Sequence, residues 1–187
     1  MKKQEIQEVA LQCFAQNGYN GTSLSQIAEA VQLKKQSLYT HFKDKDAIFL
    51  SALRHAKEVE VAFYDDFFSV KKPLLTTLHD FVEALDTMFY TSPTQQFWLR
   101  MNFSPPAHLS VEVKEEVHQI NEALREKLRP LFEENKALLH VDTAIALEAC
   151  IALIDACILH LIFHEETAII AKKREALWLV YERGVLQ

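Results

Sequence analysis

The sequence predicts an all-α protein with about nine helices. Only three glycines and five prolines interrupt 187 residues, so few positions break a helix. No stretch alternates apolar and polar residues over the length of a strand with turn signals at both ends. We expect one domain over residues 1–46 and a larger helical domain over residues 47–187, since a chain of this length can support a core in each.

Residues 1–46 are expected to form three helices. The first runs from Lys3 to Asn17, and Gly18 is placed to end it. Ser23 is predicted to be the N-cap of the second helix, because its hydroxyl can accept hydrogen bonds from the free backbone amides. Four apolar residues at i, i+3, i+4 and i+7 give that second helix one buried face: Leu24, Ile27, Ala28 and Val31. Leu38 and Phe42 anchor a short third helix. Two short helices joined by a few residues are the build of a helix-turn-helix.

The third helix carries a surface of small or basic donors, and these residues are Lys34, Lys35, Gln36, Ser37, Tyr39, Thr40 and His41. In a helix-turn-helix the second of the two helices enters the DNA major groove. There, lysine can bind guanine and glutamine can bind adenine, whereas hydroxyl and imidazole groups mainly fix the register of the protein on the duplex. We therefore predict base-facing or groove-lining roles for Lys35, Gln36, Ser37 and Thr40.

The charge distribution fits a local contact with DNA. Residues 1–45 hold six lysines and four acids, a net charge of +2. Because the whole chain has a net charge of −6, the remaining residues carry −8. A protein that coats nucleic acid indiscriminately would be strongly basic throughout. The sequence predicts a mildly basic head on an acidic body.

In this region the chain resembles the tetracycline repressor (TetR) family of bacterial transcription factors. The resemblance covers about the first quarter of the chain and rests on Phe14, Gly18, Tyr19, Thr22, Ile27, Ala28, Leu38, Tyr39, His41, Phe42 and Lys45. It implies phosphate contacts from Tyr39, His41 and Lys45, with Thr22 and Ser25 near the DNA backbone. Gln32, Lys34 and Gln36 depart from the family pattern, in which the turn often holds a glycine and a serine or threonine begins the third helix. These departures from the family pattern imply that the turn is made without a glycine.

The larger domain is expected to continue with long helices. Asp44 is a good N-cap for a helix that reaches Phe68 and ends before Pro73. Further helices are expected over Leu74 to Tyr90, around residues 97–103, over Val111 to Glu134, over Asp142 to Phe163, and at the carboxyl terminus. By resemblance, the helix that begins at Asp44 is a lever whose tilt sets the spacing of two DNA-binding heads.

Aromatic and methionine side chains concentrate between Met88 and Phe103, and broken helices of this composition can line an adaptable apolar cavity. An ordinary core is the alternative for any one of them. The resemblance places a ligand pocket in this part of the chain. The candidate ligand-binding residues are Phe63, Met88, Phe89, Trp98, Met101, Phe103, Leu128, Cys150, Ile154 and Cys157.

The helix from Asp142 to Phe163 predicts the oligomeric state. It is apolar nearly all round, and in a small chain such a helix needs a second subunit to cover it. The final helix has an apolar face too, so the two are expected to pair with their copies in a four-helix bundle. The candidate interface residues are Leu147, Ile151, Ile158, Leu161, Ile162, Leu177, Trp178 and Tyr181.

Two acids, Glu148 and Asp155, share one side of this helix with Ala144 and Ala152, opposite Cys150 and Cys157. If the acids point into the pocket, the ligand is cationic. If they point across the dimer, Lys172, Lys173 or Arg174 of the partner can pair with them, which is the interpretation we favour. Two acids within the apolar stretch, costing roughly 5 kcal/mol on insertion, argue against a membrane span.

Cofactors and catalysis are not predicted. Cys157, His160 and His164 share a helical face that suits zinc, but a fourth ligand is not evident, so we expect no metal. The three cysteines are expected to be free thiols in a reducing cytoplasm. The sequence has no glycine-rich phosphate loop, nucleophile elbow or HExxH motif, which argues against an enzyme.

These observations predict a cytoplasmic, homodimeric, sequence-specific DNA-binding regulator. The expected form is a repressor that binds a pseudo-palindromic operator on double-stranded DNA and is released by a small apolar or amphipathic effector. The alternatives are a helical protein that binds a small molecule or metal without binding DNA, and a DNA-binding activator.

Overall fold

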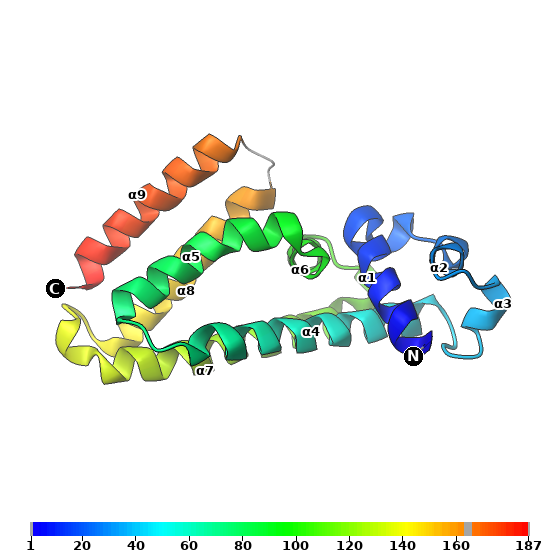
Figure 1. The fold of residues 1–187 in the computed structure, drawn as a ribbon, viewed down its shortest axis with the longest axis horizontal. Helices are drawn as coiled ribbons and strands as arrows, with labels where there is room; N and C mark the ends of the chain where they lie inside the picture. Colours follow the sequence, from blue (N-terminus) through cyan, green and yellow to red (C-terminus); the bar gives the residue numbers. More distant parts are fainter. Residues whose placement is uncertain (1, 163–165, 187) are drawn as a thin grey trace. The chain divides into compact units, whose positions relative to one another are not determined.

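The computed structural model describes residues 2–162 and 166–186, without the side chain of Ile162. In these residues nine α-helices and two short 3-10 helices account for the regular structure (Figure 1). The α-helices are α1 (Lys2–Gly21), α2 (Leu24–Ala30), α3 (Lys35–Leu38), α4 (Lys45–Ser69), α5 (Leu74–Thr91), α6 (Pro93–Phe103), α7 (Ser110–Glu134), α8 (Thr143–Ile162) and α9 (Thr167–Val185). The 3-10 helices are η1 (Ala107–Leu109) and η2 (Lys136–Leu138). The all-α prediction is confirmed.

The chain divides into two units, each with its own packing. The first unit comprises Met1–Ala62 and Ser92–Ile120, and the second comprises Phe63–Thr91 and Asn121–Gln187. Helices α4 and α7 each contribute residues to both units. This division differs from the one expected between residues 46 and 47, because the first unit also includes α6, η1 and parts of α4 and α7.

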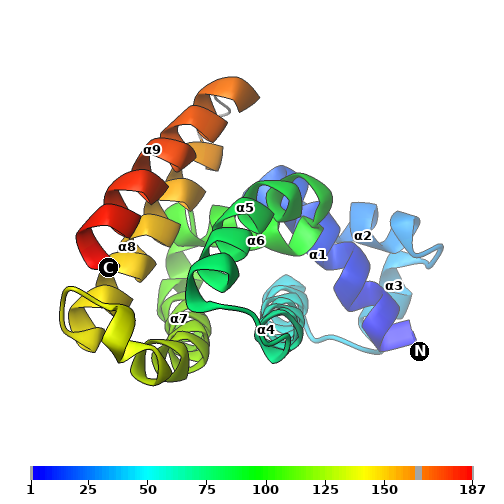
Figure 2. The same ribbon diagram turned by 60° about the vertical axis from the view of Figure 1, so that its left-hand side comes forward.

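The core of the first unit forms around α1, beside which α2 and α3 follow one another (Figure 2). Ile6, Ala10 and Phe14 are completely buried on one side of α1. Phe14 meets the ring of Phe49 on α4 edge to face, with ring centroids 5.2 Å apart. Such aromatic pairs add to the free energy gained by burial alone. The amino-terminal helices are therefore held by the start of α4.

Helix α1 is kinked at Gly18, which has φ 69° and ψ 177°. Side chains with a Cβ rarely adopt this conformation, so the sequence prediction that Gly18 ends the first regular helix is confirmed. Arg100 of α6 binds the carbonyl groups that this kink exposes. Its Nε donates to the Ala15 carbonyl at 3.0 Å, and its Nη2 donates to the Gln16 carbonyl at 3.1 Å.

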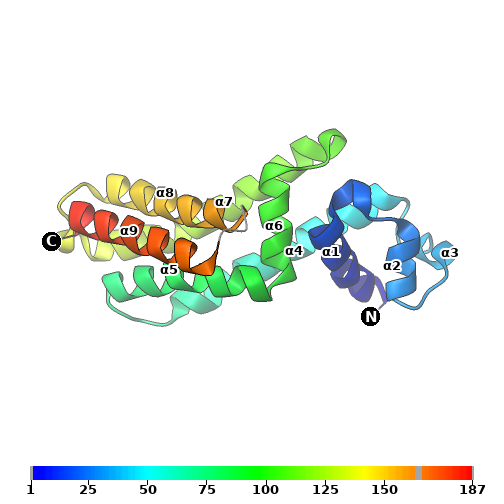
Figure 3. The same cartoon turned by 90° about the horizontal axis from the view of Figure 1, so that it is seen from above.

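In the second unit α5, α8 and α9 run side by side (Figure 3). The Tyr181 hydroxyl of α9 donates to the Ala146 carbonyl of α8 at 3.2 Å. Trp178 of α9 meets the ring of His79 on α5, with centroids 5.0 Å apart. Arg174 and Asp86 form an ion pair between the same two helices. These contacts fix both α5 and α8 against α9.

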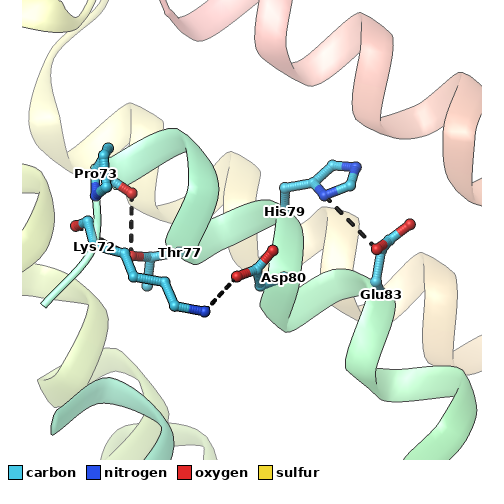
Figure 4. A network of polar contacts seen from close by, with 6 residues as sticks. All are labelled: Lys72, Pro73, Thr77, His79, Asp80 and Glu83. Atoms are coloured by element: carbon cyan, nitrogen blue, oxygen red, sulfur yellow. Dashed lines mark hydrogen bonds and ion pairs between the residues drawn. The ribbon is translucent and has the colours of Figure 1, made fainter. Parts of the chain in front are cut away.

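Polar contacts define the start of α5 (Figure 4). The Pro73 carbonyl accepts from both the backbone amide and the hydroxyl of Thr77, at 2.9 and 3.1 Å. Lys72 Nζ lies 2.6 Å from an Asp80 carboxylate oxygen, and His79 Nδ1 lies 3.9 Å from Glu83. Helix α4 ends at Ser69, before Pro73, as the sequence predicted.

Helix α8 is, among the described residues, the one helix long and apolar enough to cross a membrane, with a mean hydropathy of 2.1 over Thr143–Leu161. Length and composition alone do not distinguish such a span from the core helix of a globular unit. Its inward side packs in the second unit, where Ala146, Cys150 and Cys157 are buried. Its outward side carries Glu148 and Asp155, which favours a core helix.

Candidate nucleic-acid interface

The start of α2 is fixed by a reciprocal pair of hydrogen bonds. The Gln26 backbone amide donates to Ser23 Oγ at 3.2 Å, and the Ser23 amide donates to Gln26 Oε1 at 2.7 Å. This capping box satisfies two backbone donors at the helix end. The prediction that Ser23 is the N-cap is confirmed, and Ser25 is left exposed in the first turn.

The turn after α2 uses a left-handed residue that is not glycine. Gln32 has φ 54°. The Leu33 amide donates to the Ala28 carbonyl at 2.8 Å, and the Gln32 amide donates to the Glu29 carbonyl at 3.0 Å. These two bonds form a Schellman motif, which usually places glycine at the position of Gln32. The turn closes without glycine, and Gln32 bears the conformational strain.

Helix α3 is a single turn that further hydrogen bonds extend. The His41 and Phe42 amides both donate to the Leu38 carbonyl, at 3.0 and 2.9 Å. Leu38 is 1% exposed and Phe42 6% exposed, so both anchor this segment from below as predicted. We call residues 34–43 the recognition segment.

The outer side of the recognition segment is polar and free of acids. Seven of its side chains are exposed and one, Ser37, is half-buried; the exposed ones are Lys34, Lys35, Gln36, Tyr39, Thr40, His41 and Lys43. Tyr39 is 52% exposed although it is aromatic. Residues 30–43 include three lysines and no aspartate or glutamate. Such a surface can approach phosphates without electrostatic repulsion and present donors to base edges.

Thr22 does not offer its hydroxyl to DNA. The residue is 1% exposed, and its Oγ1 lies 2.8 Å from the Gly18 carbonyl oxygen and 3.0 Å from that of Cys13. The hydroxyl thus binds the carbonyls left open where α1 kinks. The prediction of a backbone contact from this side chain is wrong, because burial and local hydrogen bonds already use it.

Lys45 lies in a cluster at the start of α4. Its Nζ lies 4.1 Å from the centroid of the Tyr19 ring, and the Tyr19 hydroxyl donates to Asp46. His108 Nε2 lies 3.2 Å from the same Asp46 oxygen, and its ring meets Tyr19 edge to face. Asp44 caps the helix as predicted, accepting from the Ala47 amide at 2.8 Å.

Proton equilibria in this cluster follow from these contacts. The hydrogen bond from Tyr19, followed by that from His108, lowers the pKa of Asp46 below its ordinary value of 3.8. Burial raises the pKa of the Tyr19 phenol, which the Asp46 carboxylate raises further. Partial burial lowers the pKa of Lys45, and the Coulomb attraction of Asp46 opposes this effect. The predicted phosphate contact from Lys45 requires its amine to leave the Tyr19 ring.

Three residues in or against the head were not predicted from the sequence: Lys43, Arg100 and His108. Lys43 is exposed at the end of the recognition segment, and Lys3 Nζ lies 5.7 Å from the centroid of the buried Phe42 ring. Lys43 could have been found from its place in the basic segment. Arg100 and His108 contact the head from positions more than 60 residues away. Contacts between residues this far apart cannot be predicted from a local sequence pattern.

The predicted ligand-binding residues fall in both units. Trp98, Met101 and Phe103 belong to the first unit, and the others belong to the second. Trp98 and Met101 are buried, but Phe103 is 55% exposed at the last residue of α6, so it does not join the buried group. In the second unit Leu128, Cys150, Ile154 and Cys157 are buried, while Phe63, Met88 and Phe89 are half-buried.

One buried polar atom stands out in the first unit. Trp98 is 6% exposed, yet its indole Nε1 has no hydrogen-bond partner in the described part of the chain. Nearby in sequence, Gln95 Nε2 donates to the buried carboxylate of Glu60 on α4. A buried donor without an acceptor lowers the free energy of unfolding, so the unpaired indole N–H of Trp98 calls for an explanation.

The predicted interface residues mostly lie inside the subunit. Leu147, Ile151 and Leu161 of α8 and Trp178 and Tyr181 of α9 are buried in the second unit. Ile158 and Leu177 are half-buried, and the side chain of Ile162 lies outside the described residues. The assignment of these side chains to a dimer interface is therefore wrong for the buried five. A helix that is apolar all round has two apolar faces, and Leu147, Ile151 and Leu161 lie on the one that packs inside the second unit.

The outward faces of α8 and α9 carry a different set. Their exposed residues recur at helical spacing and are mostly small or aliphatic: Ala144, Ile145, Ala152 and Leu159 on α8, and Ile169, Ala176, Leu179 and Val180 on α9. We call these eight residues the outer apolar face. Val180 is 73% exposed.

Glu148 and Asp155 also point outward. Arg125 Nε and Nη2 each lie 3.2 Å from an oxygen of Glu148, a two-point ion pair within the chain. The hydrogen bond from Arg125 lowers the pKa of Glu148, whereas burial raises the pKa of Asp155. Both acids lie opposite the buried Cys150 and Cys157, so the alternative in which they point into a pocket is wrong.

The described residues contain no group of three or more histidine, cysteine or acidic side chains that could hold a metal ion. His164, the third member of the zinc set considered from the sequence, lies outside them. Cys13, Cys150 and Cys157 are free thiols. Burial raises the pKa of Cys150 to about 12 and that of Cys157 to about 11, which makes these thiols poor nucleophiles.

A capped bracing helix, a tight turn and an exposed basic segment on buried anchors define a helix-turn-helix DNA-binding protein. Residues 6–52 match the family model described as "Bacterial regulatory proteins, tetR family". Residues 6–52 therefore form the DNA-binding head of the TetR family, a family of transcriptional regulators rather than enzymes. This assignment agrees with the resemblance found in the sequence.

Comparisons with individual proteins extend beyond the head. The chain is 27% identical over 135 residues to the biofilm operon icaADBC HTH-type negative transcriptional regulator IcaR of Staphylococcus epidermidis, covering 70% of this chain and 69% of that one. Several further curated regulators match over only 70 to 101 residues, which is 22 to 53% of their own length. The chain thus spans about half or less of those relatives.

Solved structures show that the whole chain has the TetR fold. A TetR transcriptional regulator from Chloroflexus aurantiacus superposes with a TM-score of 0.79 at 20% identity, covering 98% of this chain and 96% of that one. FadR from Bacillus subtilis, solved in complex with stearoyl-CoA, superposes with a TM-score of 0.70 at 14% identity over 95% of this chain and 96% of that one. At these identities the likeness concerns the fold alone.

Proposed function

We propose that this regulator is a cytoplasmic homodimeric repressor that binds a pseudo-palindromic operator and is released by a small apolar or amphipathic effector. The recognition segment carries this proposal, because it is exposed, contains no acid and presents many hydrogen-bond donors on one short surface, as binding to DNA requires. The similarity to a negative regulator of a biofilm operon supports repression. Residues 1–46 act as the DNA-binding head, and residues 47–187 provide effector binding and dimerisation.

Within the head, the residues divide by role. Lys35, Gln36, Ser37 and Thr40 face the base edges, and Lys34, Tyr39 and His41 contact phosphates. Ser25 and Lys45 contribute at the flanks.

DNA binding is tested by fluorescence anisotropy with DNA from upstream of the protein's own gene. Tyr39→Ala is the discriminating variant, because its side chain is 52% exposed and the buried anchors stay intact. We expect affinity to fall by about tenfold or more, as for loss of a good phosphate contact in each head. Tyr90→Ala is the matched control, since Tyr90 is 50% exposed outside the head. Absence of sequence-selective, salt-sensitive binding by the wild-type protein refutes the proposal.

The outer apolar face supports dimerisation. Alanines at exposed helical positions let two helices approach closely, and two copies of α8 and α9 related by a two-fold axis would form a four-helix bundle. Ala152→Arg places a long charged side chain in the middle of this face. We expect a monomer in sedimentation or light scattering, whereas Ala137→Arg, at an exposed position of η2, leaves the dimer intact. A wild-type monomer at micromolar concentration contradicts the dimer.

The effector is proposed to accept a hydrogen bond from Trp98. Its buried indole Nε1 has no partner in the described residues, so a ligand with an apolar body and an acceptor group would satisfy it. The two tryptophans allow a direct test. Trp178→Phe leaves Trp98 as the single tryptophan, and acyl-chain ligands are then titrated while the tryptophan emission is recorded. A saturable spectral shift with loss of DNA binding supports the assignment, and an unchanged spectrum with release from DNA contradicts the role of Trp98.

A further inference from the structure

The end of α1 and the segment after α6 border a partly open cavity in the first unit, in which Arg100 is exposed, and we propose that this cavity binds a small carboxylate- or phosphate-bearing ligand through Arg100. The cavity has a volume of about 320 Å³ and is lined by residues 17–20, Arg100 and residues 104–107. This is near the lower end of the range for small-molecule sites, which suits a compact anion. The proposal does not rest on DNA binding.

Arg100 supplies the positive charge. Its Nε and Nη2 donate to the carbonyls of Ala15 and Gln16, which are neutral acceptors. Among the described residues no carboxylate forms an ion pair with Arg100, so its charge is not paired there. A guanidinium held in place by two of its donors is preorganised to bind an oxyanion with the remaining ones.

Gly18 keeps the third nitrogen of the guanidinium accessible. A Cβ built on Gly18 would lie 3.3 Å from Arg100 Nη1, which is tighter than ordinary contact. Any larger residue at this position would therefore crowd Nη1 of the guanidinium. The positive φ of Gly18 and the access to Nη1 thus depend on the same missing side chain.

The remaining lining is neutral and contains hydrogen-bond donors. The side chains of Asn20 and Ser104 line the cavity and are free of hydrogen bonds in the part of the chain that the structure describes. No aspartate or glutamate lines the cavity. Asp46 does not line the cavity and already binds the hydroxyl of the lining residue Tyr19 and the imidazole of His108. An anion in the cavity would meet one cation and neutral donors, with no carboxylate opposing it.

Occupancy has a structural consequence. Arg100 already joins α6 to the end of α1, and an anion on Nη1 would hold the guanidinium in that position. Ligand binding is therefore expected to stabilise the contact between α1 and α6 and to raise the melting temperature, because the folded state binds and the unfolded state does not.

The test uses inorganic phosphate and acetate as probes, each titrated calorimetrically into the full-length protein at ionic strength held constant with sodium chloride. We expect saturable binding with a Kd on the order of 1 mM for at least one probe. Saturation by phosphate alone identifies a phosphate-bearing ligand, and saturation by acetate identifies a carboxylate. Absence of saturable binding of both overturns the proposal.

Two further measurements locate the site. Asn20→Asp adds a negative charge to the cavity without removing a hydrogen bond, and it should weaken binding by about tenfold. Asn121→Asp makes the same charge change at an exposed position of α7 outside the cavity and should leave the Kd unchanged. In the wild-type protein the Arg100 Nε–H resonance, assigned through Arg100→Lys, should shift along the titration. Equal binding by both aspartate variants, or an unmoved Arg100 resonance during saturation, overturns the site.

Discussion

The contribution of Lys34 to DNA binding can be worked out from its position. Lys34 is exposed at the start of the recognition segment, and no acid lies within residues 30–43. Each phosphate neutralised on B-DNA contributes about 0.9 to the slope of log K against log salt concentration. A dimer has two copies of Lys34, so Lys34→Ala should reduce the steepness of that slope by about 1.8. Between about 50 and 200 mM salt, the affinity gap between wild type and variant should then narrow by about tenfold.

The assay is anisotropy of labelled upstream DNA at several salt concentrations. Lys114→Ala is the matched control, because Lys114 is equally exposed on α7 and lies outside the head. The control should leave the slope unchanged. A reduction of about 0.9 would indicate that one head alone binds DNA. If Lys34→Ala weakens binding but the two salt plots run parallel, Lys34 does not contact a phosphate and the assignment is wrong.

Two predictions concern stability. Gln32→Gly should raise the free energy of unfolding by about 0.5–1 kcal/mol in chemical denaturation, because relief of a left-handed conformation outweighs the added entropy of glycine. Glu29→Gly inside α2 should instead lower it by about 1 kcal/mol, and equal losses in both variants would contradict the reasoning. Tyr19→Phe removes the main cause of the lowered pKa of Asp46. Because the folded-state pKa is the lower one, this stabilisation is complete above the unfolded value of 3.8 and is lost as pH falls through the folded value. The difference between wild type and Tyr19→Phe should therefore shrink below about pH 4 in denaturation curves, and a constant difference would refute the link to Asp46.

The sequence predictions that the structure confirmed depend on interactions between residues a few positions apart. Ser23 and Asp44 cap α2 and α4 because each hydroxyl or carboxylate binds an amide three residues on, a relation that the sequence displays directly. Leu38 and Phe42 are buried because they are the apolar residues one turn apart in a polar segment. The DNA-facing roles of the polar residues between them remain predictions.

Predictions failed where a residue had a competing partner that the sequence pattern did not show. Thr22 is a donor of the right type for a phosphate, but it binds two carbonyls that the kink at Gly18 exposes. The facing of α8 could not be read from its composition, because a helix that is apolar all round shows no contrast between its sides.

The sequence by itself determined that this chain is helical and that its head is a helix-turn-helix, since caps, periodicity and the TetR-like residues act over a few positions. Only the tertiary structure decided which face of α8 is outward and that Arg100 reaches the end of α1. The physical reason is that both outcomes depend on contacts between residues that are distant in the sequence, such as Arg100 and the Ala15 carbonyl, which are 85 positions apart. Secondary structure is set by neighbours along the chain, whereas facing and long-range hydrogen bonds are set by neighbours in space.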